Sequence, residues 1–91
     1  MKLLTIIIPL YNEKNTILKI IDKIIGLNIE KQIIVVDDHS NDGSRDLVLK
    51  HKDKIDNLIL HDKNLGKGAA IRSAQKYIEG KFIIIQDADL E

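Results

Sequence analysis

Four groups of polar residues each follow a short aliphatic run, and they contain the side chains of this sequence that could do chemistry. They are residues 9–13, 37–44, 64–70 and 87–89. Two carboxylates spaced like Asp87 and Asp89 can converge on a hard cation, which prefers oxygen ligands and can also bridge to a diphosphate. The adjacent Asp37 and Asp38 are costly at the end of a buried strand unless they are solvated, paired or bound to a ligand. These two groups are therefore candidate binding sites.

The third group, residues 64–70, resembles a phosphate loop only in part, because the Gly and the Ser or Thr of a Walker A motif are missing. Gly at a helix start nevertheless exposes backbone N–H groups, and the helix dipole favours an anion there. Lys67 and Arg72 add positive charge to this stretch. Small residues at positions 69, 70 and 74 would also allow close packing of a helix on a sheet, and the two roles are compatible.

The other polar residues have competing structural explanations. Residues 41–44 supply turn and capping chemistry, and a lone His39 in a loop is more often exposed to solvent than bound to a metal. A dinucleotide-binding fold would place a glycine-rich turn after the first strand, but no Gly precedes Gly26. Residues 9–13 are equally well explained as a loop leading into a helix or as part of a ligand site.

The elements that must position these groups alternate along the chain. Continuous Ile and Val runs predict strands at residues 3–8, 32–36, 58–60 and 82–85, each covered on both faces. Between them, apolar residues at helical spacing from Ile17 to Ile25 predict a helix capped by Asn15 and ending at Gly26. Ser44 is the expected cap of a second helix and Asn64 that of a third, which runs to Gly80. This order predicts an α/β fold, a three-layer Rossmann-like parallel sheet with the polar groups at the carboxyl ends of the strands.

Composition excludes other classes of function. The 14 Lys and Arg residues balance 14 Asp and Glu residues, which leaves no electrostatic basis for non-specific nucleic-acid binding, and aromatic residues make up only 3%. The absence of Cys excludes disulfides and thiolate metal sites and suits a reducing compartment. No apolar run approaches the roughly 18 residues that span a bilayer.

Taken together, the four motifs resemble the family-two glycosyltransferases with the GT-A fold, and within them the polyprenyl-phosphate branch that includes the dolichol-phosphate mannose synthases. The motifs are residues 7–13 (IIPLYNE), 34–44 (IVVDDHSNDGS), 64–68 (NLGKG) and 86–91 (QDADLE). His39 and Asn41 stand where that family more often has Gly, Asn or Thr. The resemblance covers the whole chain, so we expect residues 1–91 to be the nucleotide-sugar-binding half of a GT-A domain without its acceptor half.

The resemblance also implies a role for each motif. Pro9, Tyr11 and Glu13 would line the base and ribose of a UDP- or GDP-linked sugar donor. Asp38 would accept a hydrogen bond from the base, with Val36 and Asp37 shaping that pocket. Asp87 and Asp89 would hold Mg²⁺ or Mn²⁺ against the diphosphate, Ala88 would leave room for the ribose, and Lys67 and Arg72 would contact the diphosphate. The residue that would activate the acceptor is not identified.

The implied reaction is an inverting, metal-assisted sugar transfer, with a polyprenyl or dolichyl phosphate as the expected acceptor. The expected location is cytoplasmic, at the membrane face in the full-length protein, with membrane contact made by the missing part. The 91 residues alone would then be inactive and prone to self-association. Two alternatives remain: a receiver-like domain that binds Mg²⁺ and accepts a phosphoryl group, although residues 61–63 match it poorly, and a non-catalytic nucleotide-binding module.

Overall fold

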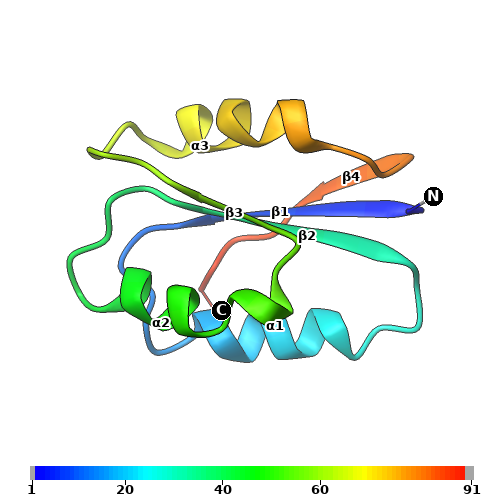
Figure 1. Ribbon diagram of the computed structural model, residues 1–91, viewed down its shortest axis with the longest axis horizontal. Coiled ribbons are helices and arrows are strands. Elements are labelled where there is room, and N and C mark those ends of the chain that lie inside the picture. Colours follow the sequence, from blue (N-terminus) through cyan, green and yellow to red (C-terminus); the bar gives the residue numbers. More distant parts are fainter. Residues whose placement is uncertain (1, 90–91) are drawn as a thin grey trace.

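The computed structural model describes residues 2–89 and shows one parallel sheet between two layers of helices (Figure 1). The elements in chain order are β1 (Leu4–Leu10), α1 (Ile17–Ile25), β2 (Lys31–Asp37), α2 (Ser44–Lys50), the 3₁₀ turn η1 (Lys52–Lys54), β3 (Asn57–Leu60), α3 (Lys67–Ala74), the 3₁₀ turn η2 (Gln75–Tyr77) and β4 (Phe82–Ile85). The strand order is β3-β2-β1-β4, with every neighbouring pair parallel. The predicted three-layer α/β fold is confirmed.

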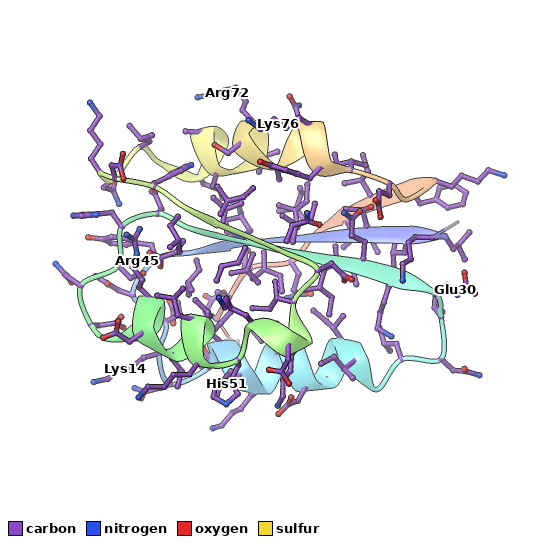
Figure 2. All side chains as sticks on the ribbon, in the orientation of Figure 1. Lys14, Glu30, Arg45, His51, Arg72 and Lys76 are labelled. Atoms are coloured by element: carbon purple, nitrogen blue, oxygen red, sulfur yellow. The ribbon has the colours of Figure 1, made fainter. Side chains whose placement is uncertain are left out.

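The two faces of the sheet carry separate hydrophobic clusters. On one face, Ile6 and Ile8 of β1 pack with the buried side of α1, which includes Ile17 and Ile21. On the other face, aliphatic residues of β1 and β2 pack against Ala70 and Ala74 of α3, whose small side chains allow close approach. Figure 2 shows Arg72 of α3 and Lys76 of η2 on the outer side of this layer, away from the sheet. Within residues 2–89, none of the helices has the length and apolar character that crossing a membrane requires.

The prediction that all four strands are covered on both faces holds only in part for β3, whose last residue, Leu60, is 39% exposed, and it is wrong for β4. The side chains of β4, from Phe82 to Ile85, are between 57% and 40% exposed, whereas the central residues of β1 and β2 are buried. The reason is the strand order: in the part of the chain that the structure describes, β4 pairs only with β1 and lies at an edge. A continuous aliphatic run cannot by itself distinguish a central strand from this edge strand.

Strand β1 is longer than predicted and includes Pro9, although proline cannot donate to a β-ladder. The backbone of Ile7 faces β4, where its carbonyl accepts from the amide of Gln86, and the carbonyl of Leu10 accepts from Asp38 on the β2 side. Because alternate residues of a strand bond to the same side, Pro9 faces β4 beyond the last residue of that strand. The pairing of β1 with β4 stops at this point, where Pro9 has no N–H to continue the ladder.

The helix starts differ from the predicted caps. The positions before α1, α2 and α3 are Thr16, Gly43 and Gly66, none with a side-chain cap hydrogen bond, so Asn15, Ser44 and Asn64 are not the caps. Gly43 and Gly66 have φ of +101° and +92°, which glycine adopts without strain. The predicted stop of α1 at Gly26 is confirmed, but α3 ends at Ala74 and continues only as η2.

A buried polar network at the amino end of the sheet connects β1 and β2 to the segment before β4. The hydroxyl of Thr5 donates to Gln32 Oε1 (2.8 Å), which also accepts from the amide of Glu79 (2.9 Å), and the amide of Gly80 donates to Thr5 Oγ1 (2.7 Å). A Cβ added to Gly80 would lie 2.4 Å from the backbone nitrogen of Thr5. Only glycine fits this close approach, which sets where β4 enters the sheet.

Candidate functional site

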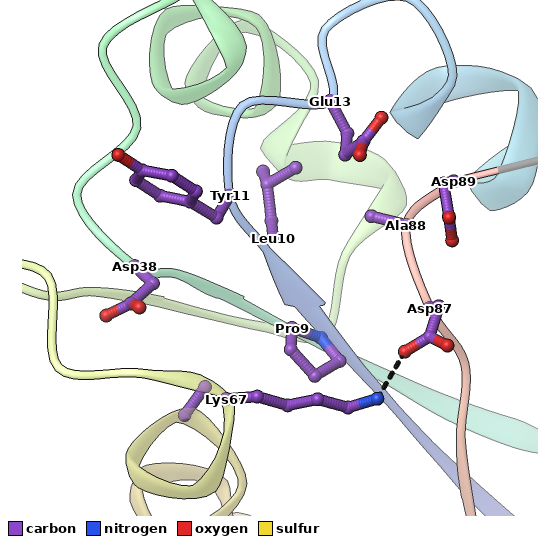
Figure 3. A pocket seen from close by; sticks show the side chains of 10 residues that line it. Pro9, Leu10, Tyr11, Glu13, Asp38, Lys67, Asp87, Ala88 and Asp89 are labelled. Atoms are coloured by element: carbon purple, nitrogen blue, oxygen red, sulfur yellow. Dashed lines mark hydrogen bonds and ion pairs between the residues drawn. The ribbon is translucent and has the colours of Figure 1, made fainter.

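A cavity of about 250 Å³ opens at the carboxyl ends of β1, β2 and β4, beside the start of α3 (Figure 3). Parallel strands bring their carboxyl ends to one edge, which is where open α/β sheets bind ligands. The lining residues are Pro9, Leu10, Tyr11, Glu13, Asp38, Lys67, Ala70, Asp87, Ala88 and Asp89. All four predicted polar groups therefore contribute to one cavity.

Eight of the eleven residues predicted for the site line this cavity, and three do not. Val36 is fully buried in the hydrophobic cluster beneath α3. Asp37 is also fully buried, and its Oδ2 accepts from Arg45 Nε at 2.6 Å. Its Oδ1 has no partner among the described residues. Arg72 extends from the outer side of α3 (Figure 2), away from the cavity lining.

One wall of the cavity is formed by Asp38, a buried carboxylate that accepts three hydrogen bonds. The amides of Leu65 and Gly66 donate to Oδ1 and Oδ2 at 2.8 and 2.9 Å, and His61 Nδ1 lies 2.9 Å from Oδ1. Burial disfavours the charged form, but the hydrogen bonds from His61 and from the two amides outweigh it, so the pKa of Asp38 is lowered from its ordinary value of 3.8. A carboxylate has about four acceptor positions, so one remains for a ligand.

The opposite wall is formed by Asp87, Ala88 and Asp89, directly after β4. The Asp87 side chain is 60% exposed, and its Oδ1 pairs with Lys67 Nζ at 2.6 Å across the mouth of the cavity (Figure 3). The described residues contain no group of three or more His, Cys, Asp or Glu side chains arranged to hold a metal. The donor set here is a carboxylate pair, which fits Mg²⁺ or Mn²⁺ when diphosphate oxygens and water supply the other ligands.

The loops after β1 and β2 are joined by hydrogen bonds from one to the other. The amides of Asn12, Glu13 and Lys14 donate to side-chain oxygens of Ser40, Ser44 and Asp42 respectively. Asp42 is partly desolvated, which raises its pKa, but hydrogen bonds from the hydroxyl and amide of Ser44 and from Lys14 lower it overall. The structural reading of residues 41–44 is therefore supported: these side chains hold the loop that carries Tyr11 and Glu13.

Sequence reasoning missed three side chains that position the site. The hydroxyl of Thr16 donates to the carbonyl of Ala88 at 2.6 Å, which joins the start of α1 to the segment between Asp87 and Asp89. Arg45 pairs with Asp37. His61 contacts Asp38, and its position directly after β3, at the same sheet edge as the four polar groups, is the signal that could have identified it.

Known proteins resemble this chain both in sequence and in structure. The chain is 32% identical over 97 residues to an undecaprenyl-phosphate 4-deoxy-4-formamido-L-arabinose transferase of Salmonella choleraesuis, covering 99% of this chain and 30% of that protein. The mannosyltransferase PcManGT from Pyrobaculum calidifontis, solved with GDP-Man and Mn²⁺, superposes with a TM-score of 0.83 at 29% identity, over 97% of this chain and 28% of the other. S. aureus TarS 1–349 in complex with UDP gives 0.85 at 29% identity, over 98% and 28%.

Each match covers nearly all of this chain but only a small part of the relative. The chain spans only 14% to 30% of the curated relatives that it matches first. The sequence pattern of one family, described as Glycosyl transferase family 2, matches residues 5–91, which is nearly the whole chain. The chain therefore belongs to glycosyl transferase family 2.

Proposed function

We propose that residues 1–91 form the donor-binding part of a glycosyltransferase that takes a sugar from a UDP- or GDP-linked donor. The observation that carries this proposal is the convergence of Asp38, Lys67, Asp87 and Asp89 on one cavity at the carboxyl edge of the sheet, in a chain of this family. The complexes of the relatives with GDP-Man and with UDP support a nucleotide ligand and leave the base open.

In this proposal each wall of the cavity meets a different part of the donor. Pro9, Tyr11 and Glu13 contact the base and ribose, and Asp38 accepts a hydrogen bond from the base through its remaining acceptor position. Val36 and Asp37 support that wall from behind, since neither lines the cavity. Lys67 contacts the diphosphate. Arg72 is a weaker candidate for that contact, because it lies on the outer side of α3 and does not line the cavity.

Asp87 and Asp89 would hold the divalent cation, and Ala88 between them would leave room for the ribose. A bound Mg²⁺ or Mn²⁺ would stabilise the negative charge that develops on the departing nucleoside diphosphate. Lys67, which pairs with Asp87 Oδ1 across the cavity mouth, can add positive charge for the same purpose. The two carboxylates, the lysine and the start of α3 therefore form the part of the site that favours departure of the leaving group.

For the whole protein, the proposed acceptor is a lipid phosphate and the proposed reaction is an inverting transfer at the cytoplasmic face of a membrane. The relative named for action on undecaprenyl phosphate supports this choice. A hydroxyl acceptor needs a general base, but a phosphate acceptor is already anionic and needs none. Because the chain spans 14% to 30% of its relatives, we expect the 91 residues alone to bind the donor without transferring its sugar.

Titration calorimetry with UDP and GDP, each with and without Mn²⁺, tests the proposal. We expect Mn²⁺-dependent binding of one nucleotide, weakened at least tenfold in Asp89→Asn because one of two metal ligands is lost. The control is Asp53→Asn, which removes the same charge from an exposed position on η1. Binding that is independent of the metal, or equal in the two variants, would contradict the assignment of the metal site.

A further inference from the structure

We propose that His61 is a positioning residue for the donor site: through Asp38 it holds residues 64–66 in place, and with them Lys67, at the cavity wall. The inference rests on the proposed function only for the identity of the ligand. It concerns a side chain that does not itself line the cavity. Both nitrogens of its ring have hydrogen-bond partners.

His61 is 7% exposed and lies between two polar side chains from other elements. Its Nδ1 is 2.9 Å from Asp38 Oδ1, and its Nε2 is 2.8 Å from Ser73 Oγ on α3. Both ring nitrogens therefore have a partner, and the ring links the end of β2 to the last turn of α3. This arrangement leaves little freedom for the imidazole to rotate.

The partners decide where the ring carries its proton. Asp38 already accepts from two backbone amides, and its lowered pKa keeps it ionised at neutral pH, so it can only accept. Nδ1 must therefore carry a proton. In the neutral ring Nε2 then accepts, and the hydroxyl of Ser73 is its donor. Ser73 thus selects the tautomer that donates to Asp38.

Asp38 passes this constraint to the cavity. Its two oxygens accept from the amides of Leu65 and Gly66, the last residues before α3, and Lys67 is the first residue of that helix. The Lys67 side chain crosses the cavity mouth to Asp87 (Figure 3). A rotated Asp38 would release both amides and displace the lysine. His61 therefore affects the site indirectly, through Asp38 and the two amides that precede α3.

The order Asp38, His61, Ser73 resembles the arrangement that activates a serine nucleophile, but the geometry does not favour that role. Ser73 is half-buried on α3 and is not among the residues that line the cavity. A nucleophile must reach a reacting atom in the site. The contacts instead fit a buried support, since the ring reaches the cavity only through Asp38, which forms one of its walls.

Two substitutions of His61 separate its two hydrogen bonds. The amide nitrogen of Asn can occupy the place of Nδ1 and donate to Asp38, whereas that of Gln reaches the place of Nε2, beside Ser73. We expect His61→Gln to weaken binding of the Mn²⁺–nucleotide about tenfold, as loss of a hydrogen bond to a charged group does, and His61→Asn to remain within about threefold of the parent. Hydrogen exchange at the amides of Leu65 and Gly66 should accelerate in His61→Gln and not in His61→Asn.

Nitrogen NMR of the neutral ring shows directly which of its two nitrogens carries the proton. The parent should carry the proton on Nδ1, and Ser73→Ala, which keeps His61 in place, should give a mixture of both tautomers. A proton on Nε2 in the parent, equal binding by the Asn and Gln variants, or unchanged exchange in His61→Gln would overturn the proposal. If the parent binds no nucleotide, the proposed function fails, while the proton position and the exchange rates still decide whether His61 holds the loop.

Discussion

Strands β2 and β4 have nearly the same kind of sequence and opposite environments. Both are aliphatic runs followed by acidic residues at the same edge of the sheet. The β2 residues Ile34, Val35 and Val36 are 0% exposed, and Asp38 beyond them accepts three hydrogen bonds from protein groups. The β4 residues are at least 40% exposed, and Asp87 beyond them has a single exposed ion pair.

This difference gives the cavity one wall whose groups are fixed by the fold and another whose carboxylates keep acceptor positions for a ligand. Strand β2 has a neighbour on each side and a helix layer on each face, so the groups at its end are fixed by the fold. Strand β4 has one neighbour among the described residues, and the carboxylates after it keep acceptor positions for a cation.

The largest expected effect is on stability, from truncating matched isoleucines of the two strands. Ile34 and Ile85 both lie on the α3 face of the sheet, since Ile85 is in register with Ile7. We expect Ile34→Ala to lower the free energy of unfolding by about 3 kcal/mol, and Ile85→Ala to lower it by less than about 1 kcal/mol. Urea denaturation measures both. Equal losses would show that β4 is as well packed as β2.

The second prediction concerns the pH dependence of stability at the end of β2. Because the pKa of Asp38 is lowered in the folded state, its stabilising contribution is complete above the ordinary value of 3.8 and is lost as the pH falls through the folded pKa. Asp38→Asn should therefore be about 2 kcal/mol less stable than the parent at pH 7, and the gap should narrow below pH 3.8. Urea unfolding at several pH values checks this, and a constant gap would contradict it.

The third prediction concerns the hydroxyl of Thr16, which donates a hydrogen bond to the segment after β4. Thr16→Val keeps the shape of the side chain and removes its hydrogen bond to the carbonyl of Ala88. We expect Mn²⁺–nucleotide binding to weaken about threefold, with a stability loss of about 1 kcal/mol, because one neutral hydrogen bond is lost. Calorimetry and urea denaturation measure these effects. Thr16→Ser is the control, which should bind like the parent.

The smallest expected effect is on self-association through the exposed side chains of β4. An aliphatic edge strand offers unpaired backbone groups to a second copy of the chain. Ile84→Lys should reduce weak self-association measured by sedimentation velocity at high protein concentration. Leu49→Lys, at an exposed position on α2, is the matched control and should leave it unchanged. A parent protein that stays monomeric at every concentration measured would contradict the prediction.

Much of the site could be predicted from residues close together in the chain. The alternation of aliphatic runs and helical patterns is local, and it is enough to place the polar groups at the carboxyl ends of parallel strands. Eight of the predicted residues consequently line one cavity. Their individual roles toward a ligand stay predictions until binding is measured.

What only the tertiary structure decided is which strands lie in the middle of the sheet and which side chains meet across it. The burial of β2, the exposure of β4 and the contacts of His61 and Thr16 with partners 23 and 72 residues away all depend on strand order and on the packing of helices over the sheet. Local patterns report the period of the backbone and not its neighbours, because burial and long-range hydrogen bonds arise only when distant segments are brought into contact.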